Sequence, residues 1–198
     1  MRPSFFVTLN NVKTKFFTGV GDSGESVIGK KSVSKSSALI EFLGGLDELN
    51  SWIGLCRVEV RGETSNEELD VAKVLRFVQE NLFVIQAEVA ALGFGYEKSP
   101  KISEEKTKYL EKVILKIDSV VPKIEKFIIP GGTELAARLD VARAITRGVE
   151  RLAKKYSDEN ALSSQLLRFL NRLSSFLFAL ARYINFKEGV KEDHPNYQ

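Results

Sequence analysis

The sequence predicts an all-α fold, a five-helix bundle preceded by an irregular, glycine-rich N-terminal segment. Three observations lead to this prediction. Apolar residues recur at helical spacing after residue 34, capping residues and helix breakers divide that part into five segments, and no stretch alternates strongly enough to require a sheet. With 198 residues, 43% of them hydrophobic, the chain can bury one sizeable core. We therefore expect a single domain over residues 1–198.

Within this domain, three parts differ in character. Residues 1–33 are expected to form the irregular segment, residues 34–187 the helical bundle, and residues 188–198 a polar tail. Because the tail "KEGVKEDHPNYQ" has few apolar residues, we expect it to fray and to leave His194 in solvent.

Start and stop signals define the five helices. Each predicted start has a hydroxyl or carboxylate side chain that can cap the first turn, and each predicted end has a breaker or a polar segment. The helices are expected from about Ala38 to Arg61 after a cap at Ser34 or Ser36, from about Ser65 to the pair Gly93 and Gly95, from Ser103 to the residues before Pro122, from Thr133 to about Tyr156, and from Ser157 or Asp158 to about Phe186.

Composition and charge exclude several classes of protein. The 29 basic residues nearly match the 26 acidic ones, and a net charge of +3 argues against a general nucleic-acid binder. No apolar run is long enough to span a membrane, and the N-terminus lacks the pattern of a signal peptide, so we expect a soluble, cytoplasmic protein. The single cysteine, Cys56, lies in an apolar helical pattern and is expected to pack in the core.

The fourth predicted helix carries arginines beside its apolar stripe. Arg143, Arg147 and Arg151 recur at intervals of four, and Glu150 lies within an arc of about 60° with the first two. Like charges at this spacing repel by a few tenths of a kcal/mol per pair, so the arrangement needs an explanation. Two interpretations stand: a solvated face paired with nearby acidic residues, or an anion site in which guanidinium groups bind phosphate oxygens.

Polar residues also gather on the first and fifth helices. In the fifth helix Arg168, Asn171, Ser175 and Arg182 share an arc of about 60°. Asparagine is a poor helix former, so Asn171 indicates a specific hydrogen bond, with plain exposure as the alternative. Asp47 lies among small and polar residues on the first helix, where packing alone could explain it. In the N-terminal segment, "TGVGDSGES" has the glycines and small polar residues of a loop that wraps a ligand.

These segments together resemble the PduO-type ATP:cob(I)alamin adenosyltransferases. The similar segments occur in order over residues 17–186: "TGVGDSGES", "VSK", "LGGLDELNSWIG", "FIIPGG", "ARAITRGVER" and "LRFLNRLSSFLFALARYIN". The resemblance implies a homotrimer of five-helix bundles that binds ATP and the corrin ring in clefts between subunits. It also implies transfer of the 5′-deoxyadenosyl group of ATP to cob(I)alamin, giving adenosylcobalamin and triphosphate. A reductase and a cobalamin-dependent mutase are expected as partners.

The resemblance assigns roles to individual residues. Arg147, Arg143 and Asp47 would be catalytic, with Asp47 paired to Arg143 across the subunit interface. Phe127 would contact cobalamin and displace the lower axial ligand, leaving a four-coordinate cobalt that is easier to reduce. Mg²⁺ would be bound mainly through the ATP phosphates, supported by Glu150. The residues expected to bind ATP are Thr18, Gly19, Val20, Gly21, Asp22, Ser26, Lys35, Arg147, Glu150, Arg151 and Asn171.

The chain departs from the family pattern at four positions. Gly19 and Val20 replace a basic residue and a threonine of the usual loop, Gly148 replaces the second of two paired arginines, and Asp140 replaces a common histidine. At least one phosphate-directed charge is therefore missing. Two alternatives to the enzyme follow: a non-catalytic relative that carries or senses ATP or cobalamin, and a helical scaffold without a ligand.

Overall fold

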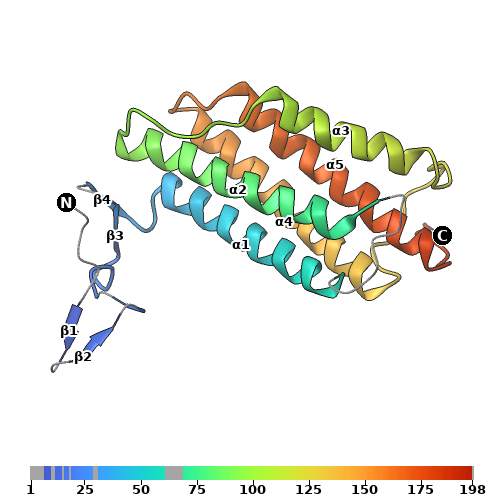
Figure 1. Cartoon of the computed structure of the whole chain (residues 1–198), viewed down its shortest axis with the longest axis horizontal. Helices are drawn as coiled ribbons and strands as arrows, with labels where there is room; N and C mark the ends of the chain where they lie inside the picture. Colours follow the sequence, from blue (N-terminus) through green and yellow to red (C-terminus); the bar gives the residue numbers. More distant parts are fainter. Residues whose placement is uncertain are drawn as a thin grey trace.

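Five helices dominate the computed structural model, which describes residues 7–9, 12–14, 16–17, 19–28, 31–60 and 69–197. The helices are α1 (Ala38–Glu59), α2 (Val71–Phe94), α3 (Glu104–Asp118), α4 (Glu134–Ser157) and α5 (Ser164–Lys187). They lie side by side as an elongated bundle (Figure 1). The predicted all-α, five-helix fold is confirmed.

The N-terminal segment contains short strands that the sequence did not predict. β1 (Val7–Leu9) pairs with β2 (Val12–Thr14), and β3 (Glu25–Ile28) pairs with β4 (Lys31–Ser34), both antiparallel. The expectation that residues 1–33 are wholly irregular was wrong, because strands of three or four residues are too short for side-chain alternation to reveal them. Figure 1 shows both hairpins beyond the start of α1, with the C-terminus at the opposite end of the bundle.

Helix α1 begins at Ala38 as predicted, but its cap and the starts of two other helices differ from the predicted ones. The observed caps are Ser37 for α1, Asp70 for α2 and Ser163 for α5, and each accepts a hydrogen bond from an amide of the first turn. Neither Ser34 nor Ser36 caps α1. The predicted start of α5 at Ser157 or Asp158 was wrong because α4 continues through Ser157. The predicted start of α2 near Ser65 lies outside the described residues, and α2 begins later, at Val71.

The core lies where α4 packs against both α1 and α5, and it includes residues from all five helices. Leucines at helical spacing form the inner face of α5, and all of them are buried: Leu166, Leu170, Leu173, Leu177 and Leu180. Cys56 is fully buried, and this burial raises the pKa of its thiol to about 11. The cysteine therefore packs as expected and stays protonated at neutral pH.

The C-terminal tail leaves His194 exposed, as predicted, but it does not fray. Two contacts hold the tail in place. Glu192 accepts hydrogen bonds from the buried Arg182, and His194 is hydrogen-bonded to the backbone carbonyl of Phe127. A sequence pattern reports neighbours along the chain, so it could not show these contacts. None of the helices that the structure describes is both long enough and apolar enough to cross a bilayer.

Candidate active site

Arg143 and Arg147 lie one turn apart on α4 and line the same small cavity. The cavity has a volume of about 270 Å³, and α5 provides its other wall through Ser174, Ser175 and Phe178. Arg147 is exposed, and no ion pair to it is found among the described residues. The predicted pair of arginines therefore does converge on a concave surface, where at least one guanidinium group is available to an anion.

Arg143 has a partner within the chain, the carboxylate of Asp140. The Nε atom of Arg143 donates to Oδ1 of Asp140 at 3.1 Å, and the side chain of Asp140 is only 12% exposed. The other carboxylate oxygen, Oδ2, accepts from the amide of Gly131 at 3.3 Å. Asp140, which departs from the family pattern, thus links Arg143 to the loop that precedes α4. Sequence reasoning did not find this link.

A second cavity, of about 380 Å³, lies on the other side of Arg143, where Pro130 and Gly131 face Asp140 and Val141. Arg143 lines both cavities, so it stands between the loop before α4 and the surface that contains Arg147.

Glu150 and Asn171 connect α4 to α5 beside the arginines. The Nδ2 atom of Asn171 donates to Oε1 of Glu150 at 2.7 Å, although Asn171 is exposed. The hydrogen bond indicated by an asparagine in mid-helix is therefore present. Arg151 is exposed one residue further along α4. Gly148 faces open space, because a methyl group added there would meet only Nη2 of Arg151, at 3.8 Å.

The glycine-rich segment forms a tight turn that holds Lys35. The amide of Asp22 donates to the carbonyl of Gly19, and Gly19 and Gly24 adopt φ angles of 71° and 85° that favour glycine. The Nζ atom of Lys35 donates to the carbonyl of Gly21 at 2.6 Å, and the amide of Lys35 donates to Gly24 at 2.9 Å. The structure therefore brings Lys35 to the predicted loop.

Three further residues of the N-terminal segment were predicted to bind ATP, and they do not all lie in the turn. Val20 lies in the same turn and is half exposed, and Ser26 lies in β3 opposite Val33 of β4. Thr18 lies outside the described residues. The bonds of Lys35 stay within the turn, and the bond of Asn171 goes to Glu150 on α4.

Phe127 lies on the segment between α3 and α4, and its side chain is 79% exposed. The end of this segment is fixed by Asn185, which donates to the carbonyl of Gly131 at 2.8 Å and accepts from the amide of Thr133 at 3.0 Å. Gly132 has a φ angle of 100°, and any side chain at that position would collide with Asn185. These contacts explain the "PGG" sequence before α4.

Asp47 is exposed on α1, and no partner for its carboxylate is found among the described residues. The proposed pair of Asp47 with Arg143 requires a second chain, so this single chain does not test it. Figure 1 places the glycine-rich turn, between β2 and β3, at one end of the bundle and the segment between α3 and α4 at the other. One chain therefore does not bring these two predicted parts of the site together.

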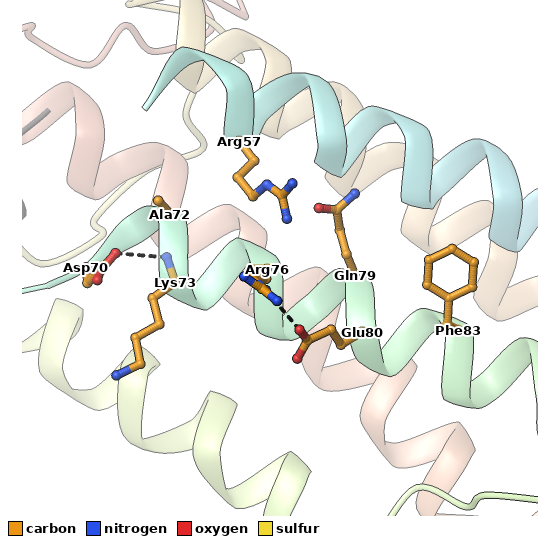
Figure 2. A pocket seen from close by; sticks show the side chains of 8 residues that line it. All are labelled: Arg57, Asp70, Ala72, Lys73, Arg76, Gln79, Glu80 and Phe83. Atoms are coloured by element: carbon orange, nitrogen blue, oxygen red, sulfur yellow. Dashed lines mark hydrogen bonds and ion pairs between the residues drawn. The ribbon is translucent and has the colours of Figure 1, made fainter. Parts of the chain in front are cut away.

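A larger cavity, of about 800 Å³, lies between α1 and α2 and contains none of the predicted site residues. Figure 2 shows Arg57 of α1 and Gln79 of α2 pointing toward one another across it, while Lys73 points away. Arg76 pairs with Glu80 along α2 at 2.9 Å, and both side chains are well exposed. Arg76 and Glu80 therefore compensate one another along the helix, whereas the Oε1 atom of Gln79 is buried and has no hydrogen-bond partner among the described residues.

Metal ligands do not cluster in the described part of the chain: no three histidine, cysteine or acidic side chains lie close enough together to hold an ion. Near the arginines, Glu150 is the acidic side chain beside Asn171, and its Oε2 atom is not used in that hydrogen bond. A divalent ion here would need most of its oxygen ligands from a bound substrate.

Comparison with known proteins identifies similar chains along most of the sequence. The family described as cobalamin adenosyltransferase matches residues 16–184. The corrinoid adenosyltransferase of Bacillus subtilis is 36% identical over 176 residues, which are 89% of each chain. The cobalamin adenosyltransferase of Cupriavidus metallidurans is 33% identical over 182 residues, 91% of this chain and 94% of the relative.

A solved structure has the same fold. It is a single-residue variant of the PduO-type ATP:corrinoid adenosyltransferase from Lactobacillus reuteri, complexed with cobalamin and ATP. The alignment gives a TM-score of 0.81 at 35% identity and covers 93% of this chain and 100% of the other.

Proposed function

The chain belongs to the cobalamin adenosyltransferase family and is an ATP-dependent corrinoid adenosyltransferase, and from this premise we propose how its residues act. The reaction joins cobalt to the ribose C5′ of ATP and breaks the bond from C5′ to the triphosphate oxygen. Cob(I)alamin supplies the electron pair, and triphosphate leaves with the electrons of the broken bond. The protein must therefore orient two substrates and stabilise a leaving group of high negative charge.

Arg147 and Lys35 bind the triphosphate in this proposal, with Arg151 nearby. The main support is the exposed guanidinium of Arg147 at a cavity that Arg143 also lines. Arginine forks suit phosphate oxygens in both charge and geometry, and they stabilise charge that grows as the bond breaks. Lys35 is held on the glycine-rich turn, where Gly19, Val20, Gly21, Asp22, Ser26 and Thr18 would contact the nucleotide.

Asn171 and Glu150 position the nucleotide and its magnesium ion. Mg²⁺ prefers oxygen ligands, keeps several waters and commonly binds through substrate phosphates with one or two carboxylates. One carboxylate beside the arginines fits an ion that arrives with ATP and takes most of its ligands from the phosphates. When bound, the ion would neutralise part of the triphosphate charge.

Phe127 contacts the corrin ring from the segment before α4. The ring of Phe127 is 79% exposed, so it is free to contact a ligand or the surface of another subunit. Placed below the cobalt, the ring would displace the lower axial ligand without replacing it. The four-coordinate cobalt(II) that results accepts an electron more readily, which favours formation of the nucleophile.

The complete site forms between subunits of a homotrimer, each subunit a single domain over residues 1–198. A cavity of about 270 Å³ is below the range of roughly 300–1,000 Å³ typical of small-ligand sites, so a second surface must enclose ATP and the corrin ring. Asp47 of one subunit would then pair with Arg143 of the next. Leu55, Val58 and Val141 are exposed on α1 and α4, as expected for a subunit contact. The protein would act in the cytoplasm, with a reductase and a cobalamin-dependent mutase as partners.

The test is a direct assay with ATP, Mg²⁺ and chemically reduced cobalamin under anaerobic conditions. We expect adenosylcobalamin and triphosphate in equal amounts, measured by the change in cobalamin absorbance and by ion chromatography. Tight binding of both substrates without product would instead identify a carrier or sensor. Release of phosphate or diphosphate in place of triphosphate would show that the bond broken is not at C5′.

A further inference from the structure

The segment that carries Phe127 is held by residues from the far end of the chain. In the connection between α3 and α4, residues 122–133 form a segment without regular structure, and the tail after α5 lies against it. The amide of Ile129 donates to the carbonyl of Asp193 at 2.9 Å. Tail and segment are therefore bonded backbone to backbone close to Phe127.

Arg182 anchors the tail. This residue is only 6% exposed, so its guanidinium group needs partners that compensate for the loss of water. Its Nε and Nη2 atoms donate to the two carboxylate oxygens of Glu192 at 2.6 and 2.9 Å, and Nη2 also donates to the carbonyl of Pro122 at 2.8 Å. Such bidentate, charge-assisted bonds fix both distance and orientation. One buried cation thus holds the tail and the start of the segment together.

His194 contacts Phe127 itself. Its Nδ1 atom lies 2.8 Å from the carbonyl oxygen of Phe127. Because a carbonyl oxygen only accepts hydrogen bonds, Nδ1 carries the hydrogen in this contact. The backbone of Phe127 is therefore bonded to the tail, while its side chain is left exposed.

Packing alone does not fix the segment. A cavity of about 350 Å³ lies between it and the tail, bounded on one side by Ile124 and Ile128 and on the other by Phe186 and Arg182. Because side chains do not fill this space, the segment could shift without losing core contacts. Asn185 and Asp140 hold the end of the segment. Nearer to Phe127 it is held by the backbone bond to Asp193, by His194, and by Arg182, which Glu192 orients.

We propose that Glu192 and His194 are positioning residues that hold Phe127 against the corrin ring. The inference rests on the proposed role of Phe127 as the aromatic residue below the cobalt. To displace the axial ligand, the Phe127 ring must stay in place while that ligand competes for the same position. If the segment were loose, the ligand would bind the cobalt again in part of the molecules. Displacements of about 1 Å at a reacting centre can cost as much as a hundredfold in rate.

The experiment compares Glu192→Ala and His194→Ala with two matched controls. Glu188→Ala removes an exposed carboxylate at the end of α5 that is not bonded to Arg182. His194→Asn keeps a donor close to the position of Nδ1, so it should restore what His194→Ala loses. His194→Ala removes a single bond at an exposed residue, so the fold should survive even if Glu192→Ala unfolds the tail.

The decisive readout is the coordination state of bound cob(II)alamin in the presence of ATP, measured by electron paramagnetic resonance. We expect Glu192→Ala and His194→Ala to lower the four-coordinate fraction, and to slow turnover from cob(II)alamin with an enzymatic reductant by about tenfold. Turnover from pre-reduced cob(I)alamin should fall less. Glu188→Ala and His194→Asn should behave as the unchanged protein. A normal four-coordinate fraction in both alanine variants would overturn the proposal.

Phe127→Ala separates this inference from the function on which it rests. If Phe127→Ala abolishes the four-coordinate species while Glu192→Ala and His194→Ala leave it unchanged, only the positioning role fails. If Phe127→Ala has no effect on that species, the proposed role of Phe127 fails, and the positioning role fails with it. In the double variant of Phe127 and His194, we expect no loss beyond that of Phe127→Ala. Additive losses would mean that His194 acts elsewhere.

Discussion

Arg147 is exposed and lines the cavity between α4 and α5. Replacing its side chain should therefore impair the reaction without destabilising the fold. We expect Arg147→Ala to lower the rate by about a hundredfold or more, because a lost contact to a developing anion costs about 2.7–4 kcal/mol in the transition state. The measurement is adenosylcobalamin formation under saturating ATP and cob(I)alamin. The unfolding midpoint should stay unchanged, since Arg147 lies outside the core.

Arg76 supplies the matched control for this prediction. It is an exposed arginine of α2 that pairs with Glu80, and it lines the cavity of Figure 2. Arg76→Ala should leave the rate unchanged, since exposed ion pairs contribute little. The opposite result, in which Arg76→Ala is impaired and Arg147→Ala is active, would move the triphosphate to the cavity between α1 and α2.

Single residues also show what the sequence could predict about the site. The position of Asn171 in mid-helix correctly indicated a hydrogen bond, because the cost of such a residue is local and visible in the sequence. Pairing of the arginines with nearby acidic residues was one of the two interpretations, and Asp140 does bind Arg143. Its second bond, from the loop amide of Gly131, was missed because a helical pattern does not relate that loop to α4. Arg182 shares a helical arc with Asn171, yet it is buried because the segment at Pro122 and the tail cover its end of α5.

At the scale of elements, α4 contains a glycine without a packing role inside the chain. Gly148 has open space around it, and glycine in a helix interior costs about 1 kcal/mol relative to alanine. We therefore expect Gly148→Ala to raise the free energy of unfolding by about 1 kcal/mol in urea, measured at fixed protein concentration.

Gly93 in α2 is the contrasting control, because a side chain there would collide with the buried Leu39. Gly93→Ala should destabilise the protein, as overpacking does. A loss of stability in Gly148→Ala would indicate that a surface from another chain packs against α4 at this point.

Element boundaries were predictable where one capping signal stood alone. Thr133 follows "PGG" with no competing hydroxyl nearby, and it caps α4 as predicted. Before α5 three candidates compete, and the cap is Ser163 because α4 extends through Ser157. The β-hairpins were missed for a different reason: their pairing joins residues on two strands, and strands of three or four residues leave too short a pattern to recognise.

At the scale of the whole molecule, the predicted site is divided between the two ends of the bundle. The turn that holds Lys35 lies beyond the start of α1, whereas the segment with Phe127 lies at the opposite end (Figure 1). Sequence reasoning identified both parts because each has local motifs, but their distance within one chain is a property of the fold. In a trimer these parts could lie close together, because the turn of one subunit could approach the arginines of its neighbour.

A test of this assembly uses two variants that are each impaired for a different reason. Asp47→Asn removes the carboxylate on α1, and Arg143→Ala removes its proposed partner on α4 of the next subunit. Each variant alone should lose about tenfold in activity, which corresponds to about 1.4 kcal/mol for a charge pair at an interface. Light scattering should give a mass three times the 22.2 kDa of one chain for the unchanged protein.

Mixed trimers decide whether the pair joins two chains. When the two variants are co-expressed in equal amounts, about a quarter of the interfaces should combine the intact Arg143 of one subunit with the intact Asp47 of its neighbour, because assembly is random. Activity should therefore rise above that of either variant alone. If Asp47 paired with Arg143 inside one chain, no mixture would restore the pair, because every chain carries one of the two changes. Arg143 already uses Nε to bind Asp140 within its own chain, so its terminal nitrogens are the atoms through which a second subunit would complete the site.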